Sequence, residues 1–361
     1  MKKVMFSIGS LYGGGAERVV SVWATQLCEA GYDVSIMLYG RTANEYVVDN
    51  RVKILCVTDK YEDFKNIPFA KRILRIREII KAELPHTIIS FLQRNQIMVM
   101  FACIGLKVNR IETVRISPWE VYKNNPIQRF LWNECFRTCK CAIIQTPEQA
   151  EYFKGKVHDK CVVVSNPINA EYLIEPELRK KEKVKRFIAS GRIDKQKNYE
   201  MMIRAFIRAH ETLPEITLSI YGSIGDKKYK DELDGIIREN GASDYISFYG
   251  RCSDMKKAYD EHDAFLMTSD FEGMPNSLAE AMARGLVCMS TACKTGPKDM
   301  LKNYDNGFLV DVGNVEEASN AIEHIASMSN EDAYKMGMCA RNSILMLCGT
   351  DNSLTLLMKI I

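Results

Sequence analysis

The sequence predicts an α/β protein with two doubly wound domains, each built on a parallel sheet. Short apolar runs of strand length alternate with segments of helical spacing through both halves of the 361 residues. The stretch from Ala264 to Gly296 contains one complete unit: a strand, a turn, a helix from Asn276 to Gly285 and a second strand. Each half, at about 170–190 residues, has an ordinary domain size.

The strand-like runs of the first half are Val4–Ile8, Val34–Leu38, Val52–Val57, Thr87–Leu92, Ile111–Ile116, Ala142–Ile144 and Val162–Val164. Between them, Glu17–Glu29 and Phe69–Glu83 have helical spacing. The runs of the second half are Phe187–Ala189, Ile216–Tyr221, Ile246–Tyr249, Ala264–Met267, Val287–Ser290 and Phe308–Val310.

We expect a first domain over residues 1–167, a linker over 168–185, a second domain over 186–350 and a terminal helix over 351–361. Asn166-Pro167 has the composition of a turn, and a charge-rich, glycine-free segment follows it. The last residues are apolar enough to pack as a helix.

The composition is that of a globular protein, with 47% hydrophobic residues, 26% charged residues and a net charge of +3. So small a charge gives no basis for a nucleic-acid partner. No apolar run approaches the roughly 20 residues of a membrane-spanning helix, and the N-terminal strand does not read as a signal peptide. The 12 cysteines are scattered and lack zinc-ligand spacing, so we expect reduced thiols in a cytoplasmic protein and no metal site.

Three loops that follow predicted strands have the composition of an anion site. Gly13-Gly14-Gly15 opens a helix, although Arg18 stands where the dinucleotide-binding pattern requires glycine, and a plain tight turn has the same composition. Arg192 and Lys197 lie five residues apart in the second loop and can converge on one diphosphate. Gly273, Met274 and Asn276 begin a helix in the third loop, where backbone amides favour an anion.

Two carboxylates accompany the third loop. Glu272 stands in the turn and Glu280 lies eight residues on, inside the helix. An ionised carboxylate accepts paired hydrogen bonds from neighbouring hydroxyls, as sugars and riboses present them. The two groups can therefore hold the two ends of an elongated polyol ligand.

These residues resemble the motifs of the retaining GT-B glycosyltransferases of family four. The resemblance rests on the Glu272-x7-Glu280 pattern, on Gly285 and on the Arg192…Lys197 run. It is strong for residues 186–310 and weaker for 1–167. It implies two Rossmann-like domains that face each other across a cleft, with the terminal helix crossing back to the first domain.

The resemblance also implies roles for individual residues. Glu272 contacts the donor sugar, Glu280 contacts the ribose, and Arg192 and Lys197 hold the leaving diphosphate. The remaining donor-binding residues are Gly14, Gly15, Arg251, Gly273, Met274 and Asn276. The family needs neither a metal ion nor a cofactor beyond its nucleotide-sugar substrate. Many members carry a histidine at the end of the fourth strand, but Ser90–Asn95 has none here, and no residue is assigned in its place.

Two segments have the composition of a membrane contact. Phe69–Lys81 is a basic amphipathic helix that suits an anionic lipid surface, and a helix packed on its own sheet has the same pattern. Pro118–Lys140 mixes aromatic and basic residues, as headgroup interfaces do, and buried aromatics are the alternative. Arg115–Pro118 ends a strand and is expected to face the acceptor.

The function that follows is transfer of a sugar from a nucleotide-diphosphate sugar, most often a UDP-sugar in this branch, to a saccharide acceptor. The branch it resembles extends lipid-linked oligosaccharides for bacterial surface polysaccharides, at the inner face of the cell membrane. A sugar-nucleotide epimerase of the same architecture and a non-catalytic subunit that binds a partner enzyme are the alternatives. A nicotinamide oxidoreductase is disfavoured because the glycine fingerprint is missing.

Overall fold

The structure, a computed structural model, describes residues 2–176 and 183–361, except for the side chains of 350–352. It divides the chain into two compact units: Met1–Pro167 with Thr350–Ile361, and Ile168–Gly349. Part of the expected linker, Ile168 with the helical turn α7 (Ala170–Leu173), packs in the core of the second unit, because Ile168 and Tyr172 are apolar and buried there. The segment 177–182 of that linker lies outside the described residues.

The first unit contains a seven-stranded sheet in the order β3-β2-β1-β4-β5-β6-β7, and every pairing among its described strands is parallel. Its strands are β1 (Lys3–Ser7), β2 (Asp33–Leu38), β3 (Lys53–Cys56), β4 (Thr87–Ser90), β5 (Asn109–Thr113), β6 (Cys141–Ile144) and β7 (Cys161–Val163). Its helices are α1 (Gly15–Glu29), α2 (Tyr61–Lys65), α3 (Phe69–Glu83), α4 (Gln93–Ala102), α5 (Pro126–Thr138), α6 (Pro147–Ala150) and α15 (Thr350–Ile360).

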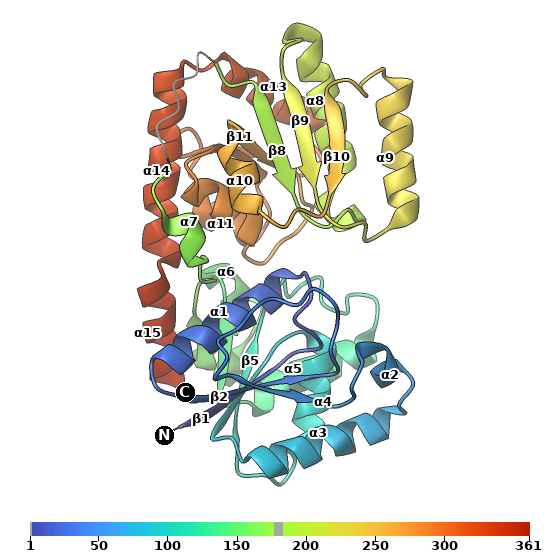
Figure 1. The fold of residues 1–361 in the computed structure, drawn as a ribbon, viewed down its shortest axis with the longest axis vertical. Helices are drawn as coiled ribbons and strands as arrows, with labels where there is room; N and C mark the ends of the chain where they lie inside the picture. The colour runs from blue at the N-terminus through green and yellow to red at the C-terminus, as the bar shows by residue number, and fades with distance from the viewer. Residues whose placement is uncertain (1, 177–182) are drawn as a thin grey trace. The chain divides into compact units, whose positions relative to one another are not determined.

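Alternate residues of β1 enter two separate cores, as the two-residue period of a strand requires. Val4 and Phe6 lie in the core that α1 and α15 cover, while Met5 lies in the core beneath α3 and α4. The indole nitrogen of Trp23 on α1 donates to the Ser353 hydroxyl on α15 at 3.0 Å, and the two helices lie side by side in Figure 1.

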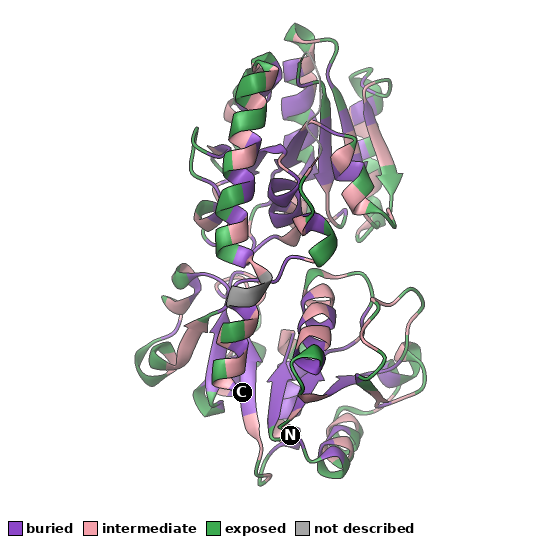
Figure 2. Ribbon diagram, turned by 60° about the vertical axis from the view of Figure 1, so that its left-hand side comes forward, coloured by how far each residue is buried: buried purple, intermediate pink, exposed green. Residues whose placement is uncertain are grey.

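The second unit contains a six-stranded parallel sheet in the order β10-β9-β8-β11-β12-β13. Its strands are β8 (Arg186–Ser190), β9 (Thr217–Tyr221), β10 (Ile246–Gly250), β11 (Ala264–Met267), β12 (Val287–Thr291) and β13 (Phe308–Val310). Besides α7, its helices are α8 (Tyr199–Thr212), α9 (Lys227–Glu239), α10 (Met255–Asp260), α11 (Asn276–Ala283), α12 (Pro297–Met300), α13 (Val315–Ser327) and α14 (Asn330–Cys348). The strands β11 and β12 are buried along their whole length, whereas the edge strand β10 is mostly intermediate or exposed (Figure 2).

The predicted α/β class with two doubly wound sheets is confirmed. The apolar run Ile111–Ile116 does not mark its strand correctly, because β5 begins at Asn109, where it pairs with β4, and ends at Thr113. In each sheet the strand order reverses once, between β1 and β4 and between β8 and β11. Ligands of such sheets bind outside the carboxyl ends of the strands at this switch point.

Candidate active site

The switch point of the second sheet brings together the loop after β8 and the loop after β11. Several hydrogen bonds join these two loops. The amide of Asp270 donates to the Gln196 carbonyl at 2.9 Å, and the Gln196 side chain donates to the Phe271 carbonyl at 2.8 Å. The Asn198 side chain donates to the Asp270 carboxylate at 2.7 Å, and the Thr268 hydroxyl donates to the Asn198 carbonyl at 2.9 Å. The two loops therefore act as one rigid platform.

Lys197 and Glu272, predicted as site residues, meet on this platform. Lys197 Nζ lies 2.5 Å from Glu272 Oε1, with 19% of the lysine side chain and 9% of the glutamate side chain exposed. The Thr295 hydroxyl, in the loop after β12, donates to the Glu272 carbonyl at 2.5 Å. A shielded charge pair of this kind is sensitive to any ligand that brings further charge or hydroxyl groups to it.

Gly296 allows the close backbone packing of the turn that follows Glu272. Gly296 has φ of +91°, and a Cβ built there would lie 2.1 Å from the Gly273 carbonyl oxygen and 3.0 Å from Pro275 Cδ. Only glycine allows this approach of the two backbones. The turn leads into α11 at Asn276, with Met274 buried beneath it.

The helix α11 carries Glu280 into the interior of the unit. Glu280 is 5% exposed, and the Tyr259 hydroxyl donates to its Oε2 at 3.4 Å. The predicted end of this helix is confirmed: the last helical residue is Ala283, and Gly285 has φ of +69°.

Arg192 pairs with Asp194 and is not part of the Lys197–Glu272 ion pair. Its Nε lies 2.6 Å from the Asp194 carboxylate, and 63% of its side chain is exposed. Its Cγ lies where a side chain on Gly225 would fall, because a Cβ built on that glycine would be 2.7 Å away. Arg251 follows β10 and is exposed, next to Tyr249, whose ring stacks on Tyr221 at 5.0 Å between centroids.

The glycine loop belongs to the first unit. Gly13 has φ of +71°, and α1 begins at Gly15 with Gly14 before it. Gly14 has φ of −101°, an ordinary value, and a Cβ built there would meet only the end of the Glu17 side chain. The backbone therefore requires glycine at position 13 more strongly than at the two predicted ligand positions.

Arg115 is expected from the sequence to face the acceptor, but its charged group lies inside the first unit. Its Cζ lies 4.7 Å from the ring centroids of both Trp23 and Phe91, and its Nη1 donates to the Asn166 side chain at 2.8 Å. Burial lowers the pKa of Arg115 to about 9. No short motif could have revealed this arrangement, because its partners are distant in sequence.

The described residues contain no group of three or more histidine, cysteine, aspartate or glutamate side chains arranged to hold a metal ion. Over the same residues, every helix is too short or too polar to cross a bilayer.

Comparison with known proteins finds a family match within the second unit. The family described as glycosyl transferases group 1 matches residues 173–343. Among curated relatives, the chain is 27% identical to the GalNAc-alpha-(1->4)-GalNAc-alpha-(1->3)-diNAcBac-PP-undecaprenol alpha-1,4-N-acetyl-D-galactosaminyltransferase of Campylobacter jejuni, over 86% of this chain and 85% of the relative. It is 25% identical to an uncharacterized glycosyltransferase of Haemophilus influenzae, over 92% of each.

Solved structures match over nearly the full length. TarM of S. aureus, in complex with Fondaparinux, alpha-GlcNAc-glycerol and UDP, has a TM-score of 0.82 at 12% identity and covers 100% of this chain and 99% of its own. Anabaena HepE in complex with UDP and glucose has a TM-score of 0.82 at 16% identity and covers 99% of each chain. These structures show the fold, which is the GT-B architecture, and residues 173–343 match the glycosyl transferases group 1 family.

Proposed function

We propose that the chain is a retaining glycosyltransferase that moves a sugar from a UDP-sugar to a saccharide carried on a lipid diphosphate. The observation that carries the proposal is the Lys197–Glu272 contact at the switch point of the second sheet. This contact places the Lys197 ammonium, which suits a diphosphate, beside the Glu272 carboxylate, which suits sugar hydroxyls. Relatives named for undecaprenol-linked substrates and neighbours solved with UDP support the choice of donor and acceptor.

In this proposal the residues share the work of stabilising the departing diphosphate. Lys197 and Arg192 offset its charge, and the backbone at Gly273, Met274 and Asn276 supplies amide donors at the start of α11. Since side-chain cations carry the charge, the proposed mechanism assigns no role to a metal ion.

The other assigned residues hold the donor in place. Glu272 binds the sugar hydroxyls and Glu280 the ribose. Arg251 borders the base, and Gly14 and Gly15 approach the phosphates. By resemblance to the family, the acceptor hydroxyl loses its proton to the departing phosphate, so that the new bond forms on the same face of the sugar as the broken one.

The test is UDP release from a panel of UDP-sugars, with and without a bacterial lipid extract. We expect one donor to give release that the extract accelerates and that Glu272→Ala reduces at least tenfold, equivalent to about 1.4 kcal/mol of barrier. Absence of release with every donor would favour a non-catalytic subunit. Conversion of one UDP-sugar into another without release would favour an epimerase.

A second part of the proposal is contact with the inner face of the cell membrane through α3. This helix exposes Phe69 and Leu74, 47% and 57% respectively, beside the exposed cations Lys71 and Arg75. By contrast, Arg72 of the same helix donates to the backbone carbonyl of Ile67.

The membrane contact is tested by co-sedimentation with phosphatidylglycerol vesicles and with phosphatidylcholine vesicles. Binding to the anionic vesicles should be lost in Lys71→Glu/Arg75→Glu. It should persist in the control Lys227→Glu/Lys228→Glu, which changes two exposed lysines of α9. Equal binding by both variants would contradict the assignment to α3.

A further inference from the structure

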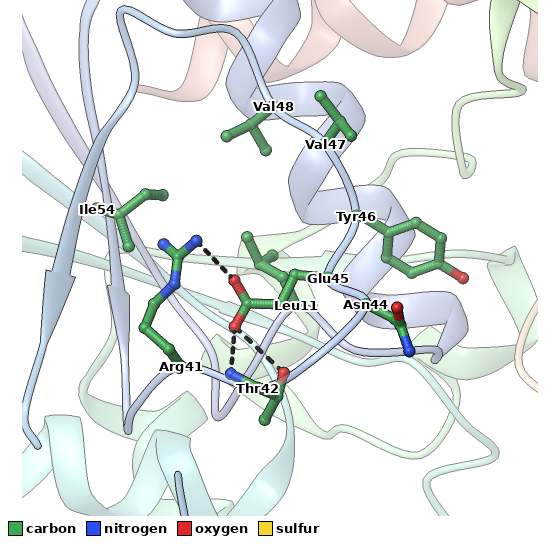
Figure 3. A pocket seen from close by; sticks show the side chains of 9 residues that line it. All are labelled: Leu11, Arg41, Thr42, Asn44, Glu45, Tyr46, Val47, Val48 and Ile54. Carbon is green, nitrogen blue, oxygen red and sulfur yellow. Dashed lines mark hydrogen bonds and ion pairs between the residues drawn. The ribbon is translucent and has the colours of Figure 1, made fainter. Parts of the chain in front are cut away.

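A pocket of about 430 Å³ lies within the first unit and contains none of the residues assigned to the donor (Figure 3). Its volume falls in the range of roughly 300–1,000 Å³ that is usual for small-molecule sites. The lining residues come from the loops after β1 and β2 and from β3. Leu11 and Arg41 follow the carboxyl ends of β1 and β2, where ligands of parallel sheets bind, whereas Ile54 lies within β3.

The wall of the pocket is an ordered loop over residues 41–51. This loop has neither helix nor strand, and backbone hydrogen bonds anchor it along its length. The Arg41 amide donates to the Asp59 carbonyl at 3.1 Å, and the Asp49 amide donates to the Thr25 hydroxyl at 3.1 Å. The Tyr46 amide donates to the Leu11 carbonyl at 2.9 Å, which ties the pocket to the loop that continues to Gly14. A long loop fixed in this way is a typical place for a binding function.

A charge pair within the loop gives the pocket its polar chemistry. Arg41 Nη2 lies 3.0 Å from Glu45 Oε2, and Glu45 Oε1 accepts hydrogen bonds from the Thr42 amide at 2.7 Å and from its hydroxyl at 3.1 Å. These contacts, dashed in Figure 3, hold the Glu45 carboxylate in place. The Glu45 side chain is 8% exposed and the Arg41 side chain is 54% exposed. The carboxylate is therefore fixed, and the guanidinium remains accessible to a ligand.

This chemistry selects for a neutral polyol. The pair carries no net charge, and an anion drawn to Arg41 would meet the carboxylate of Glu45. A ligand with adjacent hydroxyls can instead donate to the carboxylate and accept from the guanidinium. The lining also includes Leu11, Val48 and Ile54, whose apolar side chains suit the C–H face of a pyranose ring.

We propose that this pocket binds a neutral hexose or N-acetylhexosamine residue of the acceptor, other than the residue that receives the new sugar. The assignment of the ligand to the acceptor rests on the proposed function. Binding of the saccharide itself does not require turnover, so the two can be tested separately.

The experiment is saturation-transfer NMR on the full chain without donor, using the methyl α-glycosides of N-acetylgalactosamine, N-acetylglucosamine, galactose and glucose as probes. At least one glycoside should bind, and Arg41→Ala and Tyr46→Ala, which each shorten a side chain of the pocket lining, should each weaken that binding at least fivefold. The matched control is Arg51→Ala, in the same loop and 58% exposed, which does not line the pocket and should bind like the unmodified chain. Thermal unfolding of each variant separates lost binding from lost folding.

The proposal would be overturned if no glycoside bound, or if Arg41→Ala and Tyr46→Ala left the binding unchanged in folded protein. Competition by UDP or inorganic phosphate for the same signal would also overturn it, because the site would then be an anion site. In turnover assays Arg41→Ala should raise the KM for the lipid-linked acceptor and leave the KM for the donor unchanged. If no donor supports turnover but glycosides still bind at this pocket, the proposed function fails and the saccharide site stands.

Discussion

Replacing Lys197 with alanine should weaken UDP binding more than the loss of one contact would suggest. A hydrogen bond to a charged group contributes about 1.5–3 kcal/mol, which corresponds to about tenfold to about a hundredfold in affinity. Lys197 and Glu272 are 19% and 9% exposed, so solvent screens their interaction poorly, and we expect a loss near the upper value. The variant also leaves the Glu272 carboxylate without the cation that lies 2.5 Å from it.

That remaining carboxylate makes a second substitution informative. UDP lacks the sugar to be transferred, which is the proposed partner of Glu272, so Glu272→Ala removes no ligand contact from a UDP complex. In Lys197→Ala/Glu272→Ala the repulsion between the diphosphate and the carboxylate is gone, and UDP affinity should recover in part. Turnover should stay low, because the groups proposed to hold the diphosphate and the sugar are both missing.

Isothermal titration of UDP into the unmodified chain, the two single variants and the double variant measures this coupling. Lys195→Ala is the control, since Lys195 is an exposed lysine in the same helical turn as Lys197. This variant should bind UDP as tightly as the unmodified chain. Unchanged UDP affinity in folded Lys197→Ala would refute the assignment of the diphosphate to Lys197. A double variant that binds no better than Lys197→Ala would refute the repulsion argument.

Three further predictions concern the second unit. Gly296→Ala should lower the melting temperature and turnover more than Gly313→Ala. Both glycines have positive φ, which costs an alanine about 1–2 kcal/mol at either position, but only at Gly296 would the new Cβ clash with a backbone, that of Gly273. Equal effects of the two substitutions would contradict this account. Glu280→Gln should weaken UDP binding about tenfold in calorimetry and leave pyrophosphate binding unchanged, since its proposed partner is the ribose; a parallel loss of both would disprove that role. Burial lowers the pKa of His262 below its usual 6.5, so the imidazole binds a proton more readily in the unfolded chain than in the folded one, and the free energy of unfolding should fall as the pH drops below about 6.5. In urea unfolding, His262→Asn should remove the contribution of His262 to this pH dependence. A variant with the same pH profile as the unmodified chain would exclude that contribution.

The alternation of apolar runs was sufficient to predict most of the fold. Each strand of the second sheet lies within one residue of its predicted run, and α3 begins at Phe69 and ends at Glu83 as predicted. The run Ile111–Ile116 misled because hydrogen-bond pairing, and not hydrophobicity, decides where a strand ends. β5 instead begins with polar residues, including Arg110, which forms a buried pair with Glu112 at 2.9 Å.

The candidate site could be predicted only in its parts. The motifs drew attention to Lys197 and Glu272, but their contact joins loops 75 residues apart and depends on the strand order at the switch point. The pocket beside Arg41 was missed because its lining follows no motif. Its shape comes from backbone contacts that bring Leu11 against the loop over residues 41–51.

Mass spectrometry of the lipid-linked acceptor after incubation with the chain and a UDP-sugar tests the central claim most directly. The account predicts that the acceptor gains the mass of one sugar residue with the unmodified chain and with Lys195→Ala, and does not gain it with Lys197→Ala or Glu272→Ala. An acceptor that stays unmodified with every UDP-sugar, or is extended equally by all four proteins, would contradict it.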